Sequence, residues 1–223
     1  ENSLTSDHMA RPVLYTYWRS SCSWRVRIAL ALKSIDYDSR PVHLVKEGGE
    51  QHKEEYGALN PTNTVPTLII DGETLCESLA IIEYLDSTRP EQTPLIPKDP
   101  ISAAKARKIA LMIACETQPV QNLRVLQHVE KEMGAEKKGE WAKHWITVGM
   151  SAVEKSLEGS RDFCVGDSVT VADICLVPQV YNAVRWGVDM SQFPNISRIN
   201  EALSSLPAFK AAHPDVQPDA VPA

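Results

Sequence analysis

The first hydrophobic segment of the chain, Val13 to Trp18, is short and rich in β-branched and aromatic residues, which predicts a β-strand. Four small residues, Ser20 to Ser23, follow shortly after this segment and end the strand pattern. From Trp24 to Lys33 the apolar residues recur at helical spacing, while Arg25 and Arg27 fall off the apolar face. The pattern therefore predicts a strand, a tight junction and a helix whose arginines lie off its apolar face.

A second strand is expected at Tyr37 to Leu44, where β-branched and aromatic residues return. The polar segment from Glu47 to Tyr56 predicts a loop or a short helix. Because a strand, a helix and a second strand follow one another, the two strands are expected to pair in parallel.

The next segment carries a hairpin signal. Val65 to Ile70 predicts a short buried strand, and Asp71-Gly72 is typical of a tight turn that returns through Thr74 to Cys76. Ser78 to Ser87 then has apolar residues at helical spacing. The expected order is β-α-β-α-β-β-α, a four-stranded mixed sheet with helices, ending near residue 90.

The second half has only helical patterns and begins after a segment with three prolines, Thr93 to Pro100. Thr170 to Asp173 reads as a capping box, in which a threonine and an acidic residue satisfy each other's backbone N–H groups. The expected helical segments are 103–131 with an interruption at Pro119, 141–158, 170–185 with a kink at Pro178, and 194–206.

The fold class is thus an α/β domain followed by an all-α domain. The expected divisions are a tail at 1–12, an α/β domain at 13–90, a linker at 91–99, a helical domain at 100–217 and a tail at 218–223. The first tail is polar, and an origin in a cloning vector is one hypothesis for it.

Composition narrows the function. The 223 residues carry a net charge of −6, which disfavours nucleic acid as a partner. No apolar run approaches the roughly 20 residues that cross a bilayer, so a cytoplasmic protein without a membrane segment is expected. The five cysteines include no C-x-x-C pair and the six histidines are scattered, so neither a disulfide framework nor a metal site is expected.

Three short segments are candidates for ligand binding. Ser20-Ser21-Cys22-Ser23 stands at a helix start, where free N–H groups and the helix dipole favour an anion. Val65-Pro66 opens a strand and is a place for a cis bond, which turns the preceding backbone towards a peptide-like ligand. Glu77-Ser78 combines a carboxylate, a hydroxyl and free N–H groups, which suits an amino acid. Each segment taken alone also fits an ordinary helix cap or strand start.

Taken together, the segments resemble a known family. The matching stretches are SSCSWRVRIALALK, NPTNTVPTLIIDG, ESLAIIEYL, QPVQNLRVL, VGDSVTVADICLVPQV and AAHPDVQPD, and the resemblance spans Pro12 to Asp219. They are similar to the zeta-class glutathione transferases, the maleylacetoacetate isomerases. The resemblance implies a thioredoxin-like first domain, an all-helical second domain and a homodimer.

The resemblance also implies roles for individual residues. Ser20, Ser21 and Cys22 match the catalytic segment that holds the glutathione sulfur, with Ser20 as hydrogen-bond donor and Cys22 assisting. Arg19 and Arg185 are expected to bind the substrate. The residues expected to bind glutathione are Ser20, Ser21, Cys22, Ser23, Trp24, Arg25, Gln51, Val65, Pro66, Glu77, Ser78, Gln118, Asn122, Leu123 and Arg124. Family members often have glutamine where Glu77 stands.

The implied activity is the cis–trans isomerisation of maleylacetoacetate to fumarylacetoacetate in tyrosine and phenylalanine catabolism, with transferase activity on small α-haloacids. Two other interpretations stay open. A thiol–disulfide oxidoreductase would use Cys22, although no resolving cysteine lies nearby in sequence. A non-catalytic binding module would keep the fold but not need the sulfur-contacting hydroxyl.

Overall fold

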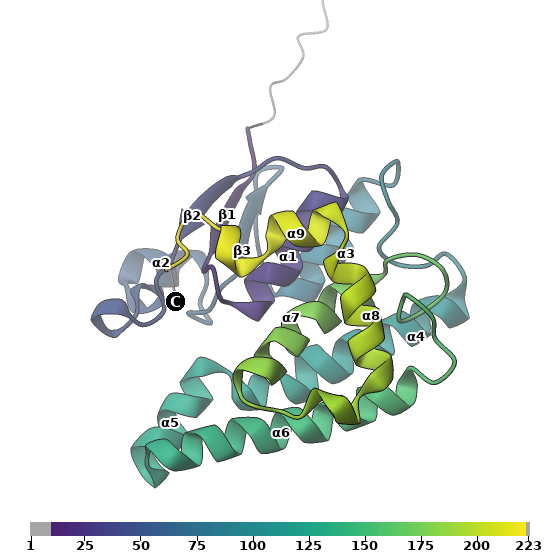
Figure 1. The fold of residues 1–223 in the computed structure, drawn as a ribbon. Helices are drawn as coiled ribbons and strands as arrows, with labels where there is room; N and C mark the ends of the chain where they lie inside the picture. The colour runs from purple at the N-terminus through teal and green to yellow at the C-terminus, as the bar shows by residue number, and fades with distance from the viewer. Residues whose placement is uncertain (1–9, 222–223) are drawn as a thin grey trace, which may run out of the picture.

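The computed structural model describes residues 10–221, and Figure 1 shows an α/β half joined to a helical half. Most of the expected N-terminal tail and the last two residues lie outside the described residues. The elements of the first half are β1 (Val13–Thr16), α1 (Ser21–Leu32), β2 (Asp38–Pro41), the 3-10 turns η1 (Lys46–Gly48) and η2 (Glu50–His52), α2 (Glu54–Leu59), β3 (Thr67–Ile70), β4 (Glu73–Cys76) and α3 (Ser78–Thr88).

The sheet confirms the expected mixed topology. Its strands lie in the order β2-β1-β3-β4, with β1 and β2 parallel and the other pairs antiparallel. Asp71 and Gly72 both have positive φ, 54° and 82°, as a two-residue turn of this hairpin requires. The end of β1 and the start of α1 lie at the C-terminal end of the parallel strands, and Ser20 to Ser23 lie at this junction.

The helical half contains α4 (Pro100–Leu111), the π-helical turn η3 (Met112–Thr117), the 3-10 turn η4 (Pro119–Gln121), α5 (Leu123–Met133), α6 (Ala135–Ser156), α7 (Val171–Arg185), η5 (Met190–Gln192), α8 (Pro194–Ser204), α9 (Pro207–Ala212) and η6 (Pro214–Val216). The helical stretch expected at 103–131 is interrupted at Pro119 as expected, because η3 ends at Thr117 and η4 begins at Pro119. The capping box is confirmed, since the Asp173 carboxylate accepts hydrogen bonds from the Thr170 N–H and hydroxyl.

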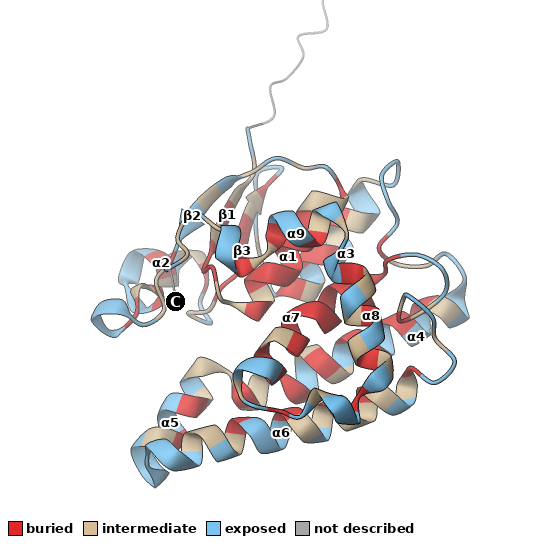
Figure 2. Cartoon of the chain, viewed as in Figure 1, coloured by how far each residue is buried: buried red, intermediate tan, exposed pale blue. Residues whose placement is uncertain are grey.

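Helix α1 is buried along most of its length, including Arg25 and Arg27, which the sequence pattern places off its apolar face. It packs against α3, α7 and α9, and Figure 2 shows α1 and α7 largely buried. Arg25 and Arg27 are each 1% exposed. Arg27 donates to the Trp18 and Ala212 carbonyls, at 2.8 and 3.1 Å, and its burial lowers its pKa to about 10. The second half of the chain thus covers the helix face that a sequence pattern assigns to solvent.

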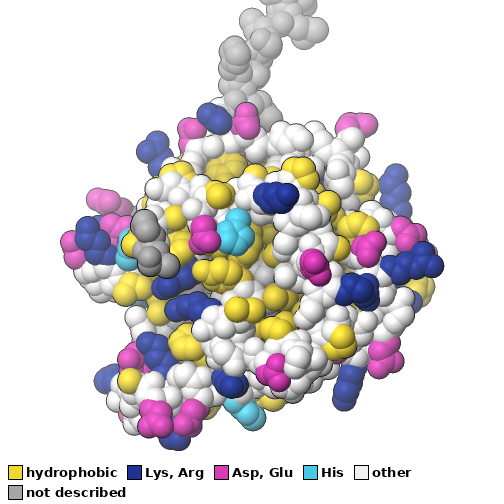
Figure 3. Space-filling model, viewed as in Figure 1, with side chains coloured by type: hydrophobic (Ala, Val, Ile, Leu, Met, Phe, Trp, Pro, Cys, Tyr) yellow, Lys and Arg dark blue, Asp and Glu magenta, His cyan; other side chains and the backbone are white. Residues whose placement is uncertain are grey.

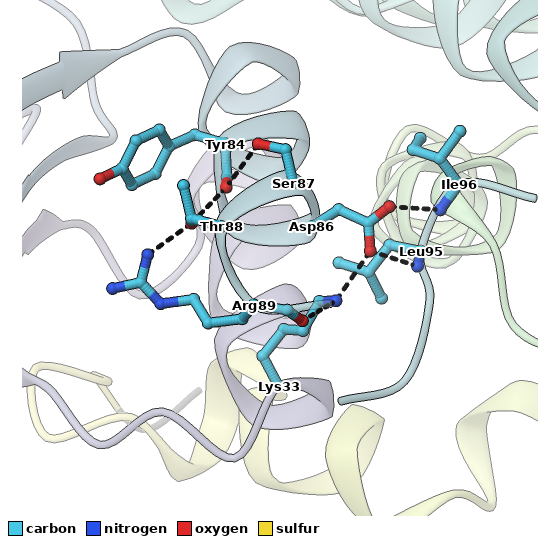
Figure 4. Close-up of polar contacts among 8 residues, drawn as sticks. All are labelled: Lys33, Tyr84, Asp86, Ser87, Thr88, Arg89, Leu95 and Ile96. Carbon is cyan, nitrogen blue, oxygen red and sulfur yellow. Dashed lines mark hydrogen bonds and ion pairs between the residues drawn. The ribbon is translucent and has the colours of Figure 1, made fainter. Parts of the chain in front are cut away.

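The segment between the halves is fixed to the first half by a partly buried carboxylate (Figure 4). Asp86 accepts hydrogen bonds from the backbone N–H groups of Leu95 and Ile96, at 2.8 and 3.1 Å, and from the Lys33 ammonium at 2.7 Å. Lys33 also donates to the Arg89 carbonyl. None of the described helices is both long enough and apolar enough to cross a membrane.

Candidate active site

The junction between β1 and α1 is a helix N-terminus with a free hydroxyl proton. Ser20 is the N-cap of α1, and its Oγ accepts a hydrogen bond from the Ser23 N–H at 3.2 Å. Because the hydroxyl accepts there, its own proton remains available to donate outward. Ser21 and Cys22 occupy the first turn, where backbone N–H groups have no partner within the helix. This junction therefore offers several donors to an anion.

Two neighbouring cavities meet at this junction. The first, of about 380 Å³, includes Ser20 and Ser21 in its lining, and the second, of about 270 Å³, includes Cys22. Gln118 and Asn122, which flank the 3-10 turn before α5, line both cavities. The start of α1 thus lies where the two cavities adjoin, and both halves of the chain contribute to each.

The second cavity collects the other two segments singled out in the sequence. The Val65–Pro66 peptide bond is cis, and both residues line the cavity. Glu77 and Ser78 line it at the start of α3. Glu77 has φ +66°, a conformation that non-glycine residues adopt at a cost of about 1–3 kcal/mol and that concentrates at functional sites. A second helix start therefore faces the same cavity.

Arg25 supplies this cavity with a buried and unpaired positive charge. Its Nη1 donates to the Ser78 hydroxyl at 3.2 Å and lies 3.8 Å from the Cys22 sulfur. Its Nε and Nη2 are buried without a hydrogen-bond partner among the described residues. No carboxylate of the described chain forms an ion pair with Arg25. Because a buried charge needs a partner, the site is suited to an anionic ligand.

The first cavity contains two further guanidinium groups. Arg19 lies over the Trp18 ring at 5.2 Å and Arg185 over the Trp186 ring at 5.0 Å. Neither forms an ion pair within the described part of the chain. Partial burial and then the nearby charge of Arg19 lower the pKa of Arg185. Figure 3 shows Lys and Arg side chains bordering the hollow between the two halves. The cavity therefore favours a ligand with more than one carboxylate.

Most of the residues singled out from the sequence line these two cavities. In the first are Arg19, Ser20, Ser21, Gln118, Asn122, Leu123 and Arg185, and in the second are Cys22, Arg25, Val65, Pro66, Glu77, Ser78, Gln118, Asn122 and Arg124.

Three of the residues expected to bind the cofactor lie elsewhere. Trp24 points to the other side of α1, where its ring contacts Tyr181 and His213 and lines a separate cavity. Ser23 is fully buried and meets the site only through its backbone N–H to Ser20. The Gln51 amide nitrogen donates to the Leu44 carbonyl, and Gln51 lines neither cavity.

The first cavity also has lining residues that sequence reasoning missed. Asn182 lies one helical turn before Arg185 on α7, so helical spacing was a usable signal for it. Tyr17 directly precedes Trp18 and Arg19 at the end of β1 and could have been inferred from that position. Glu130 and Lys138 lie on α5 and α6, and no local pattern points to them.

Comparison with known proteins identifies the class to which the sequence motifs pointed, the glutathione transferases. The family model for the glutathione S-transferase N-terminal domain matches residues 19–88, and that for the C-terminal domain matches residues 121–212. The chain is 56% identical over 222 residues to probable maleylacetoacetate isomerase 2 of Drosophila melanogaster, covering 99% of this chain and 95% of the relative. It is 53% identical over 210 residues to maleylacetoacetate isomerase of Rattus norvegicus, covering 94% and 95%.

Solved structures of similar fold belong to the same class. A maleylpyruvate isomerase described as a bacterial zeta-class glutathione S-transferase in its holo form superposes with a TM-score of 0.90, at 38% identity, over 94% of this chain and 100% of that one. Maleylacetoacetate isomerase of Anaeromyxobacter dehalogenans, with glutathione bound in the active site, gives 0.85 at 42% identity over 94% and 98%. The corresponding enzyme of Methylobacterium extorquens, with malonate and glutathione bound, gives 0.89 at 36% over 94% and 100%.

The chain therefore has the fold of a glutathione transferase. Within that superfamily, the chain belongs to the zeta class, the family of the maleylacetoacetate isomerases.

Proposed function

We propose that this protein catalyses the glutathione-dependent cis–trans isomerisation of maleylacetoacetate to fumarylacetoacetate, a step of tyrosine and phenylalanine catabolism. The observation that carries the proposal is the pair of adjoining cavities. Among the described residues, one has a buried guanidinium without an ion-pair partner and the start of α3, and the other has two arginines without ion-pair partners. Ser20 and Cys22 lie where they meet, which suits a sulfur held between a peptide site and a dicarboxylate site.

The residues of the second cavity fit glutathione. Its γ-glutamyl end carries both an α-carboxylate and an α-ammonium group. The Ser78 hydroxyl and the first N–H groups of α3 are donors for the carboxylate, and Glu77 is a partner for the ammonium. The unpaired nitrogens of Arg25 add positive charge beside Ser78. We also assign Val65 to the cysteinyl part, and Gln118, Asn122, Leu123 and Arg124 to the contacts from the helical half. Gln51 does not itself line either cavity, but its amide donates to the carbonyl of Leu44, which lines the first cavity, and we assign Gln51 to the glycyl part on the family resemblance.

When bound, glutathione supplies a thiolate that adds reversibly to the cis double bond and so permits rotation about it. The residues of this chain lower the pKa of the bound thiol, so that the sulfur is ionised near neutral pH. A free thiol has a pKa of about 8.5, and lowering it by two units needs roughly 2.7 kcal/mol. The start of α1 contributes about 0.3–2 kcal/mol, and a hydrogen bond from Ser20 about 1.5–3 kcal/mol. The two together are sufficient, with Cys22 and Ser21 completing the surroundings of the sulfur.

The first cavity then accounts for the choice of substrate. Maleylacetoacetate carries two carboxylates, and the guanidinium groups of Arg19 and Arg185 have no competing ion pairs among the described residues. The same groups suit the single carboxylate of a small α-haloacid, which supports a transferase side activity. The chain's negative net charge is no obstacle because Arg19 and Arg185 place positive charge at the cavity itself.

We further propose a cytoplasmic homodimer, in keeping with the family. Each subunit would consist of a glutathione-binding domain at 13–90, a linker at 91–99 and a substrate domain at 100–217.

The test is turnover of maleylacetoacetate with glutathione, with S-methylglutathione and with neither. S-methylglutathione keeps the peptide contacts but has no free thiol. Isomerisation with glutathione alone is the expected result. Equal turnover under all three conditions would show that the sulfur is not required and would refute the proposal.

A further inference from the structure

The hairpin formed by α5 and α6 adds a third cation to the first cavity. Helix α5 ends at Met133, Gly134 turns the chain with φ +94°, and α6 begins at Ala135. Figure 1 shows this hairpin at the far end of the helical half. Lys138, near the start of α6, and Glu130, near the end of α5, both line the cavity, together with residues 44 and 45 of the first half.

Lys138 holds a carboxylate at the cavity wall. Its ammonium lies 2.5 Å from the Glu130 carboxylate. Its side chain is 26% exposed, whereas that of the adjacent Lys137 is 49% exposed. Glu130 is the only carboxylate among the described residues that line the cavity, where Arg19 and Arg185 are the other cations. The Lys138–Glu130 pair therefore shows a carboxylate-binding position on α5 and α6, elements other than those that carry the two arginines.

We propose that Lys138 binds the distal carboxylate of a long dicarboxylate, and that Glu130 occupies this position until such a ligand displaces it. The inference rests on the proposed function and names the residue that selects for substrate length. Arg19, which follows β1, and Arg185, the last residue of α7, line the same cavity, and after partial burial the charge of Arg19 contributes to lowering the pKa of Arg185, so we assign both to one end of the ligand. A ligand with carboxylates at both ends of a long chain needs a second cation further along the cavity.

Displacement of Glu130 is energetically feasible. An ion pair that is partly exposed to water contributes little net free energy, because solvation competes with the attraction. A ligand anchored at its other end presents its second carboxylate to Lys138 at high effective concentration. A short dicarboxylate such as malonate does not gain in this way, because its two carboxylates are separated by one carbon atom. Lys138 is thus expected to favour long over short dicarboxylates.

The test measures equilibrium binding of two unreactive dicarboxylates, suberate and malonate, to the protein saturated with glutathione. Isothermal titration calorimetry gives both dissociation constants without any turnover. Lys138→Ala should raise the Kd of suberate about tenfold, equivalent to about 1.4 kcal/mol. It should raise that of malonate less than about twofold, since malonate does not reach Lys138. Lys138→Arg should restore suberate binding.

Glu130→Gln distinguishes ligand binding from a purely structural pair. If Glu130 competes with the ligand, its neutralisation should lower the Kd of suberate about threefold, opposite in sign to Lys138→Ala. If the pair only joins α5 to α6, both substitutions should act in the same direction and on both ligands. That result would overturn the inference.

Lys137→Ala is the matched control. Lys137 is on the same helix and pairs with Glu140 at 2.6 Å, but it does not line the cavity. It should leave both dissociation constants unchanged, and a loss of suberate binding equal to that of Lys138→Ala would refute a specific role for Lys138. Suberate and malonate have no double bond, so their binding does not depend on catalysis. If the binding changes occur as expected but the protein does not isomerise maleylacetoacetate, only the proposed function is refuted.

Discussion

Replacing Ser20 should impair ionisation of the bound glutathione. In the structure the Ser20 Oγ accepts from the Ser23 N–H at 3.2 Å, so its own proton is free for the sulfur. A hydrogen bond to a charged group contributes about 1.5–3 kcal/mol. At about 1.36 kcal/mol per unit, Ser20→Ala should raise the pKa of the bound thiol by about 1–2 units. The assay is a pH titration of the ultraviolet absorbance of the thiolate in the complex.

A second substitution separates this effect from the loss of the helix cap. Alanine at an N-cap costs about 1 kcal/mol of stability, whereas glycine costs only a few tenths. Ser20→Gly should therefore raise the thiol pKa as much as Ser20→Ala while leaving α1 nearly as stable. Ser20→Thr keeps both the hydroxyl and the cap and should retain a low thiol pKa. If all three variants bind glutathione with the wild-type thiol pKa, the hydroxyl is not the donor and the reasoning is refuted.

Three other substitutions test separate parts of the account. Cys22→Ala should keep measurable isomerase activity, because Ser20 and the start of α1 remain; complete loss, with Ser20→Ala silent, would favour a redox role for Cys22. Arg185→Ala should raise the KM for the dicarboxylate about tenfold without weakening glutathione binding, and an unchanged KM would remove Arg185 from the substrate site. Asp173 is fully buried and accepts three hydrogen bonds at 2.8 Å. Asp173→Ala should therefore lower the free energy of unfolding in urea by about 3 kcal/mol, and a loss below about 1 kcal/mol would contradict that.

Much of the fold could be predicted because local patterns determine it. The Asp71-Gly72 turn and the Thr170 capping box each specify a backbone conformation through their own side chains, and the structure has both. The burial of Arg25 and Arg27 could not be predicted in this way. Helical periodicity assumes one face in solvent, but α7 and α9, from the far end of the chain, cover that face of α1.

The candidate site was predictable where a short motif carries its geometry. Ser20, Glu77 and Ser78 stand at helix starts, and the structure places all three at the cavities. Trp24 is adjacent in sequence but lies on the opposite side of α1, because successive helical residues point in directions about 100° apart. Lys138 could not be identified from the sequence because its place in the site depends on the α5–α6 hairpin, which brings it to the cavity that residues of both halves line.

The pKa of the glutathione thiol bound to the unmodified protein tests the central claim most directly. The account predicts that the bound thiol titrates about two units below the free value of about 8.5, so that the thiolate predominates at neutral pH. Glutathione that binds tightly yet titrates at the free value would contradict it, because the protein would then hold no nucleophile for the proposed reaction.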